Sequence, residues 1–235
     1  MSNLELSVIV PTFNEAKNIG LLINHVFKAT TQAQIFAELI IVDDQSPDGT
    51  AKIAEEIGEA YGVRVFVRAK RDGLGSAILD GIKLAQAPVI CVMDADLSHP
   101  AETIPEMYKI IKKGRALMVV GSRHVKGGST SKWIWYRKFL SWGARKIAGM
   151  ITPVKDLTSG FFMFDKQIID GVDIKPIGWK VGLELMVKGK HQGKIVEHPI
   201  IFTERASGES KAGLKETFQY LQHISALAWH KISAR

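Results

Sequence analysis

Two pairs of aspartates are the residues of this sequence best suited to chemistry. Asp94 and Asp96 flank one small residue, and Asp43 and Asp44 are adjacent; each pair follows an apolar run. Paired carboxylates suit a hard divalent cation bound together with a diphosphate, because Mg²⁺ takes few carboxylates and completes its shell with water and phosphate oxygens. A helix N-cap with a charged neighbour is the alternative. Two acidic pairs on one edge would repel each other unless a cation or ligand donors compensate them.

The segment from Arg205 to Lys211 is a second candidate for ligand binding. Arginine offers phosphate a planar fork and lysine a mobile point charge, while Gly208 permits a tight turn between them. The segment is therefore either a phosphate clamp or an ordinary solvated loop. His99, beside the second aspartate pair, is either a metal ligand or a loop residue that precedes a proline.

Glycine-rich nucleotide motifs are incomplete. The segment Gly73-Leu74-Gly75-Ser76-Ala77-Ile78 lacks the third glycine of a dinucleotide fingerprint, and no G-x-x-x-x-G-K-[ST] sequence occurs. We therefore expect a glycine-rich helix start that faces a ligand, and no dinucleotide-binding site.

The elements that must position these residues alternate along residues 1–120. Short apolar runs and helical patterns at this spacing predict a mostly parallel, Rossmann-like sheet with helices on both faces, which is an α/β fold. Ligands of such sheets bind beyond the carboxyl ends of the strands, where both aspartate pairs fall. The expected strands are 6–10, 39–42, 63–67, 88–93 and 116–120, and the expected helices are 15–30, 47–61, 73–86 and 100–113.

Residues 121–235 are predicted to decorate this sheet, so that 1–235 form one domain. We expect strands at 160–164 and 195–202 and helices at 133–151, near 181–190 and from about 214. The helix at 133–151 has two aromatic stripes; the stripe of Trp135, Phe139 and Trp142 lies either in a membrane interface or in the core.

Charge separates the two halves of the chain. Residues 1–120 carry 12 Lys and Arg against 15 Asp and Glu, a net charge of −3, whereas residues 121–235 carry 19 against 9, a net charge of +10. All five tryptophans lie in the basic half, which favours nucleic acid, an anionic membrane surface or a phosphate-bearing ligand as its partner. Acidic pairs on the ligand edge argue against nucleic acid.

Composition points to an ordinary globular protein of a reducing compartment. Hydrophobic residues make up 46% of the 235 residues, and a lone Cys91 inside an apolar run allows no intramolecular disulfide. Apolar runs are far shorter than the roughly 18 residues of a bilayer span, and the first ten residues lack a signal-peptide pattern. We therefore expect a cytoplasmic protein.

Several motifs in order resemble family 2 inverting glycosyltransferases of the A-type nucleotide-diphospho-sugar fold. The second half is similar to one branch, the dolichyl- or polyprenyl-phosphate mannosyltransferases. The family motifs are Val10-Pro11-Thr12-Phe13-Asn14-Glu15, Val42-Asp43-Asp44-Gln45-Ser46-Pro47-Asp48-Gly49-Thr50, Arg71-Asp72-Gly73-Leu74-Gly75-Ser76-Ala77 and Asp94-Ala95-Asp96-Leu97-Ser98-His99-Pro100; the branch motifs are Gly121-Ser122-Arg123, Asp156-Leu157-Thr158-Ser159-Gly160-Phe161 and residues 202–211.

The resemblance implies a role for each matching residue. Base and ribose would be held by Pro11, Asn14, Glu15 and Asp43, metal and diphosphate by Asp94 and Asp96, and the phosphates of donor and lipid would face Arg123, Arg137, Ser141, Arg205 and Lys211. The residues expected to act directly in catalysis are Asp96, Arg123, Arg205 and Lys211. Phe162 stands where this branch usually has Arg or Lys, and Ser98 where some relatives place a metal-contacting Gln.

Together these observations predict a metal-dependent inverting glycosyltransferase using Mg²⁺ or Mn²⁺. It would move mannose from GDP-mannose onto a polyprenyl phosphate such as dolichyl phosphate, with residues 1–120 holding the nucleotide-sugar and residues 121–235 the acceptor. The protein would lie peripherally on the cytosolic face of a membrane, with a membrane-anchoring subunit as a possible partner. The alternatives are transfer of glucose or an N-acetylhexosamine from a UDP-sugar, and a catalytically silent subunit that binds nucleotide-sugar or lipid.

Overall fold

A seven-stranded sheet lies at the centre of the computed structural model, which describes residues 3–130, 152–176, 178, 180–203, 222–229 and 231. The strand order is β3-β2-β1-β4-β7-β5-β8. All neighbouring strands are parallel except β7, which runs antiparallel to both β4 and β5. A two-residue pairing of β6 with β9 forms a second, small sheet.

The elements of the first half are those the apolar pattern predicts, with different ends. Helix α1 starts four residues and α2 three residues later than expected, because the preceding segments form loops at the sheet edge. The strands are β1 (Leu6–Thr12), β2 (Ala37–Asp43), β3 (Arg64–Val67), β4 (Val89–Val92) and β5 (Met118–Ser122), and the helices are α1 (Ile19–Gln32), α2 (Thr50–Gly58), α3 (Leu74–Leu84), η1 (Ala101–Thr103) and α4 (Ile104–Lys112).

Two predictions for the second half need correction. The strand expected at 160–164 begins two residues later, because residues 159–161 form a loop against the acidic edge, and the strand expected at 195–202 is divided in two at Ile200. The elements are β6 (Ser129–Thr130), β7 (Phe162–Asp165), η2 (Lys166–Ile169), α6 (Val181–Lys188), β8 (Ile195–Pro199) and β9 (Ile201–Phe202), followed by a helix over residues 222–229. The predicted helix at 133–151 and the start of the one from 214 lie outside the described residues.

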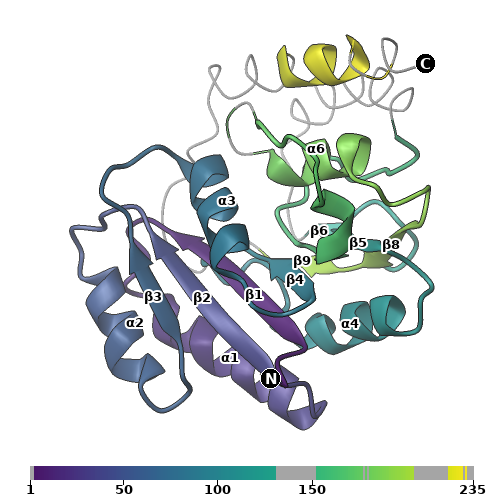
Figure 1. Cartoon of the computed structure of the whole chain (residues 1–235). Coiled ribbons are helices and arrows are strands. Elements are labelled where there is room, and N and C mark those ends of the chain that lie inside the picture. The colour runs from purple at the N-terminus through teal and green to yellow at the C-terminus, as the bar shows by residue number, and fades with distance from the viewer. Residues whose placement is uncertain are drawn as a thin grey trace.

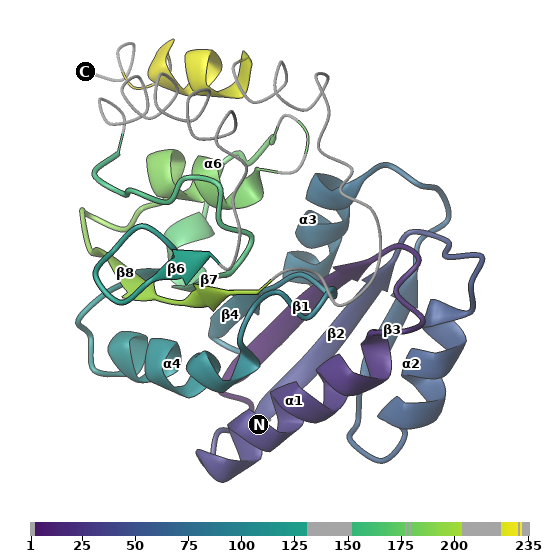
Figure 2. The ribbon, with the colours of Figure 1, turned by 180° about the vertical axis from the view of Figure 1, so that it is seen from behind.

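Helices cover both faces of the sheet, as predicted (Figure 1). One core cluster joins the sheet to α1 and α4, with α2 beside α1, and a second joins the other face to α3, α6 and the helix over 222–229. Figure 2 shows the same layers from behind. No helix within the described residues is long and apolar enough to cross a membrane.

Candidate functional site

The loops that follow β1 and β2 are joined by side chains at the carboxyl edge of the sheet. Asp43 is almost fully buried, and its Oδ1 accepts hydrogen bonds from the hydroxyls of Thr12 (2.8 Å) and Ser46 (2.6 Å). Its Oδ2 accepts one from the backbone N–H of Ser46 at 2.8 Å. Asp43 therefore fixes the geometry of both loops, and a direct contact with base or ribose stays a prediction.

Three consecutive backbone amides after β1 donate to side chains of the loop after β2 and of the first residue of α2. The N–H of Asn14 binds Ser46 Oγ at 2.9 Å, that of Glu15 binds Thr50 Oγ1 at 2.9 Å, and that of Ala16 binds Asp48 Oδ2 at 3.0 Å. Asn14 itself has a left-handed φ of 61° and an exposed side chain. The 14–16 loop is thus preorganised by a neighbour more than thirty residues away.

Two other predicted residues belong to the same region. Pro11 is buried in β1 opposite Val42, and the Glu15 carboxylate accepts a hydrogen bond from Asn18 Nδ2 at 2.8 Å. The structure therefore brings Pro11, Asn14, Glu15 and Asp43 to one edge, as the sequence predicts.

The charge of Asp44 is compensated by the protein itself. Arg68 Nη1 lies 2.5 Å from Asp44 Oδ1, and its Nε lies 3.0 Å from Asp80 Oδ2. Arg68 and Asp44 are both buried. A bound cation is therefore not needed to hold the first acidic pair, which leaves the second pair as the candidate metal site.

Asp94 and Asp96 lie beyond the end of β4, so the alternation of side chains along a strand does not decide where their carboxylates point. The chain turns directly after Asp96, at Leu97, whose φ is 62°. Asp96 is only 4% exposed, and its Oδ1 accepts hydrogen bonds from the hydroxyl (2.5 Å) and backbone N–H (3.1 Å) of Ser98. The side chain of Asp94 is 35% exposed. Asp94 is thus the more accessible carboxylate of the pair.

The loop before β7 packs directly onto Asp94. A Cβ atom at Gly160 would stand 2.8 Å from Asp94 Oδ2, closer than van der Waals contact allows. His99 stacks on Phe161 with 5.3 Å between ring centroids, and its Nδ1 accepts the backbone N–H of Asp94 at 3.1 Å. Burial lowers the pKa of His99, although the charges of Asp94 and Asp96 oppose the shift. His99 therefore supports the acidic loop through a neutral ring.

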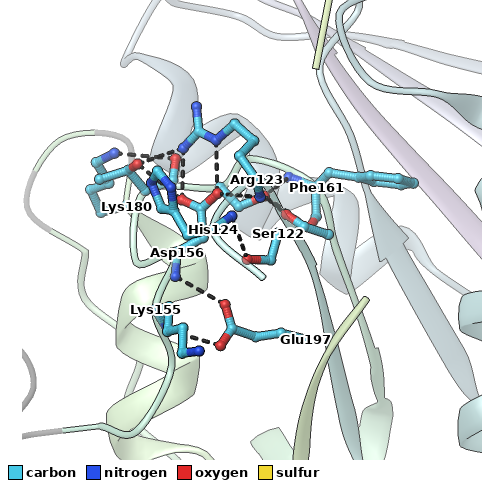
Figure 3. Close-up of polar contacts among 11 residues, drawn as sticks. Ser122, Arg123, His124, Lys155, Asp156, Phe161, Lys180 and Glu197 are labelled. Carbon is cyan, nitrogen blue, oxygen red and sulfur yellow. Dashed lines mark hydrogen bonds and ion pairs between the residues drawn. The ribbon is translucent and has the colours of Figure 1, made fainter. Parts of the chain in front are cut away.

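Arg123 follows β5 and forms a buried ion pair (Figure 3). Its Nε and Nη2 donate to the two carboxylate oxygens of Asp156, each at 2.7 Å, and Nη2 also donates to Thr158 Oγ1 at 2.7 Å. Burial alone would raise the pKa of Asp156, but the hydrogen bonds and charge of Arg123 lower it to about 2. The predicted phosphate contact of Arg123 must therefore use its remaining nitrogen, Nη1.

Two charged residues near this pair were not predicted. Glu197 accepts the backbone N–H groups of Lys155 (2.9 Å) and Asp156 (3.0 Å), and Lys180 Nζ lies 3.5 Å from the carbonyl oxygen of Thr158. Burial, together with the charge of Arg123, lowers the pKa of Lys180 well below its usual range. The position of Glu197 within a mostly apolar strand was a sequence signal that could have identified it as a functional candidate. Lys180 has no comparable sequence signal.

The remaining predicted site residues, Arg137, Ser141, Arg205 and Lys211, lie outside the described residues. The chain just before Arg205 does meet the acidic loop: the backbone N–H of Thr203 donates to Ser98 O and its hydroxyl to Leu97 O, each at 3.3 Å. Phe162, which stands where the mannosyltransferase branch usually has Arg or Lys, is a fully buried core residue of β7.

Comparison with known proteins agrees with this arrangement. A sequence profile for "Glycosyl transferase family 2" matches residues 7–172. The chain belongs to glycosyl transferase family 2. It is 42% identical over 228 residues to the "Dolichol-phosphate mannosyltransferase" of Pyrococcus furiosus, covering 95% of this chain and 64% of that protein. It is 37% identical over 230 residues to a protein of the same name from Mycosarcoma maydis, covering 94% of this chain and 78% of that one.

Solved structures place this family 2 glycosyltransferase in a known fold. The mannosyl-3-phosphoglycerate synthase of Rubrobacter xylanophilus superposes with a TM-score of 0.71 at 17% identity, covering 95% of this chain and 73% of that one. The fold is therefore the predicted A-type glycosyltransferase fold.

The acidic edge of the glycosyltransferase is suited to a diphosphate with a cation. No cluster of three or more His, Cys, Asp or Glu side chains that could hold a metal occurs among the residues the structure describes. Mg²⁺ does not need one, since one or two carboxylates with substrate phosphates suffice. Asp94 and Asp96 fit that donor set, because one is accessible and the other is fixed by Ser98.

Proposed function

We propose that this glycosyltransferase moves mannose from GDP-mannose onto the phosphate of a polyprenyl lipid such as dolichyl phosphate, with inversion at the anomeric carbon. The similarity to two dolichol-phosphate mannosyltransferases carries the proposal, because it extends over at least 94% of this chain and thus beyond the family match at residue 172. The chain spans 64% of the length of the Pyrococcus furiosus relative, so the proposal concerns the catalytic chemistry that these 235 residues can support.

The donor diphosphate would lie at the acidic edge with Mg²⁺ or Mn²⁺ held by Asp94 and Asp96. A divalent cation there supplies charge stabilisation to the leaving nucleoside diphosphate. The protein's own contribution is preorganisation: Ser98 orients Asp96, and His99 and Gly160 define the position of Asp94. Base and ribose would then extend toward the 14–16 loop and Asp43.

The acceptor phosphate would approach from the basic half. A phosphate is already ionised at neutral pH, so the reaction needs cations that orient the nucleophile and does not need a strong general base. Arg123 can offer Nη1, and Thr203 anchors the chain two residues before Arg205 beside the acidic loop. We assign Arg137, Ser141, Arg205 and Lys211 to the phosphates on the basis of the sequence motifs.

The lipid acceptor implies contact with a membrane surface. The net charge of +10 in residues 121–235 favours an anionic cytosolic leaflet, and Trp229 is 73% exposed on the helix over 222–229. We propose that the protein binds peripherally at this face of the membrane, alone or with an anchoring subunit, and that residues 1–120 and 121–235 serve donor and acceptor within one domain.

Transfer assays test the proposal directly. The purified protein is incubated with Mg²⁺ or Mn²⁺, polyprenyl phosphate and, separately, radiolabelled GDP-mannose, UDP-glucose and UDP-N-acetylglucosamine, and the label in the organic phase is counted. We expect label from GDP-mannose that depends on lipid phosphate and metal. Label from a UDP-sugar alone would mean that this UDP-sugar, and not GDP-mannose, is the donor. The absence of label from every donor would favour a catalytically silent binding subunit.

A further inference from the structure

Glu197 connects the paired strands β5 and β8 to the loop at residues 155–156. It lies in β8, opposite Val120 of β5 in the parallel register, and β5 leads directly into Arg123. Its two carboxylate oxygens accept the backbone N–H groups of Lys155 and Asp156 at 2.9 and 3.0 Å. Two adjacent amides bound by one carboxylate leave the backbone at residues 155–156 little freedom to rotate.

The loop held in this way determines the orientation of Asp156. The Asp156 side chain is completely buried, so its direction follows from its backbone and from its partner Arg123. Arg123 in turn binds Asp156 through its side chain and also through its backbone N–H, at 3.0 Å. The chain and its hydrogen bonds thus form a closed ring: β5 continues into Arg123, Arg123 binds Asp156, the Asp156 N–H binds Glu197, and the strand of Glu197 pairs with β5.

The ring leaves one direction for ligand binding. Nε and Nη2 of Arg123 are used within it, and Nη1 has no hydrogen-bond partner in the described part of the chain. Figure 3 shows this third nitrogen pointing away from Asp156, with Glu197 on the opposite side of the network. Any rotation of the 155–156 backbone would turn the Asp156 carboxylate and, with it, the guanidinium plane.

We propose that Glu197 is a positioning residue that, through the backbone of Lys155 and Asp156, fixes the direction in which Arg123 offers Nη1 to a substrate phosphate. This inference rests on the proposed function for the identity of the phosphate, whereas the positioning itself is independent of substrate. The inference predicts that Glu197 affects sugar transfer only through Arg123, although the hydrogen bonds of the two side chains go to different partners.

A double-mutant cycle with an arginine resonance tests this. Glu197→Gln keeps one acceptor oxygen and should lower the transfer rate about tenfold, and Glu197→Ala should lower it about a hundredfold, as small misplacements of an orienting group do. In the Arg123→Lys background, Glu197→Ala should cost less than about twofold more, because the group it positions is gone. Losses that multiply would overturn the inference, since they indicate a structural role alone.

The second readout needs no substrate. The ¹⁵N–¹H resonance of Arg123 Nε can be assigned by its loss in Arg123→Lys, and its chemical shift should change in Glu197→Gln. The matched control is Glu38→Gln, which should leave that chemical shift unchanged. Glu38 is also a strand carboxylate that accepts a backbone N–H, that of Gln86 at 2.7 Å. An unmoved Arg123 resonance in Glu197→Gln would overturn the inference. If the wild type transfers no sugar, the proposed function fails, and the resonance alone decides whether Glu197 positions Arg123. If Glu197→Ala does not fold, both the double-mutant cycle and the resonance measurement are made with Glu197→Gln.

Discussion

The Asp94 carboxylate lies directly against the backbone of Gly160: a Cβ atom at residue 160 would lie 2.8 Å from Oδ2 and 3.1 Å from Oδ1 of Asp94. The accessible aspartate of the acidic loop therefore has its position because residue 160 is glycine. A carboxylate is the movable end of its side chain, so a methyl group there should displace it without unfolding the protein.

Gly160→Ala is thus predicted to lower metal-dependent transfer about 10- to 100-fold and to weaken Mn²⁺ binding, while the melting temperature changes little. Transfer kinetics and Mn²⁺ titration followed by electron paramagnetic resonance provide the measurement. The matched control is Gly182→Ala, whose Cβ would press on the Phe162 ring at 3.0 Å. That variant should lose stability and keep its Mn²⁺ affinity; equal Mn²⁺ affinity in both variants would contradict the prediction.

The second carboxylate is predicted to be needed for catalysis. Asp96→Ala removes a buried oxygen pair that Ser98 orients, and it should lower transfer about 10²–10³-fold, the usual cost of losing a preorganised electrostatic group. Wild-type transfer should stop in EDTA and return with Mg²⁺ or Mn²⁺. Undiminished transfer in EDTA would show that the acidic loop acts without a metal.

The 14–16 loop offers a prediction about the donor alone. Thr50→Val keeps the shape of the side chain but leaves the N–H of Glu15 without its acceptor, a loss of about 1 kcal/mol and hence about fivefold. We expect the KM for the nucleotide-sugar to rise by that factor with kcat nearly unchanged. Steady-state kinetics measures both constants, and Thr30→Val, which removes a hydroxyl within α1, should change neither. A fall in kcat alone would place Thr50 in the chemical step.

The sequence could predict the parallel sheet and its ligand edge, because both follow from local patterns. Apolar runs of strand length mark β1, β2 and β4, and the polar residues just after them mark the edge. It could not predict that β7 would insert antiparallel between β4 and β5. The apolar residues of Phe162–Asp165 fit either direction, and the neighbours that decide lie about forty to seventy residues away.

The sequence identifies the candidate site residues that follow apolar runs, and it does not identify the residues that hold the loops around them. Asp43, Asp94 and Asp96 are conspicuous as polar residues after apolar runs. Ser46, Thr50 and Glu197 bind backbone amides of distant loops, and nothing next to them in the sequence identifies those partners. Long-range amide acceptors of this kind become visible only when the loops have been placed in space.

The Arg123–Asp156 pair should make stability depend on acidity. The folded protein lowers the pKa of Asp156 from 3.8 to about 2, so its carboxylate contributes stability above pH 4 that is lost as the pH falls toward 2. The shift corresponds to about 2 kcal/mol. Urea unfolding of wild type and Asp156→Asn between pH 6 and pH 3 measures it.

The sign of the effect follows from proton uptake. Near pH 3 the unfolded chain binds a proton at residue 156 that the folded protein does not, so acid destabilises the wild type more than it destabilises Asp156→Asn, which keeps the other carboxylates with lowered pKa values. The difference in unfolding free energy between the two proteins should therefore narrow from pH 6 to pH 3. Asp173→Asn serves as the control, since that exposed aspartate pairs with Lys175 at the surface and its removal should change stability by less than about 0.5 kcal/mol at every pH. A difference for Asp156→Asn that stays constant across this range would mean that Arg123 does not hold the carboxylate in its ionised form.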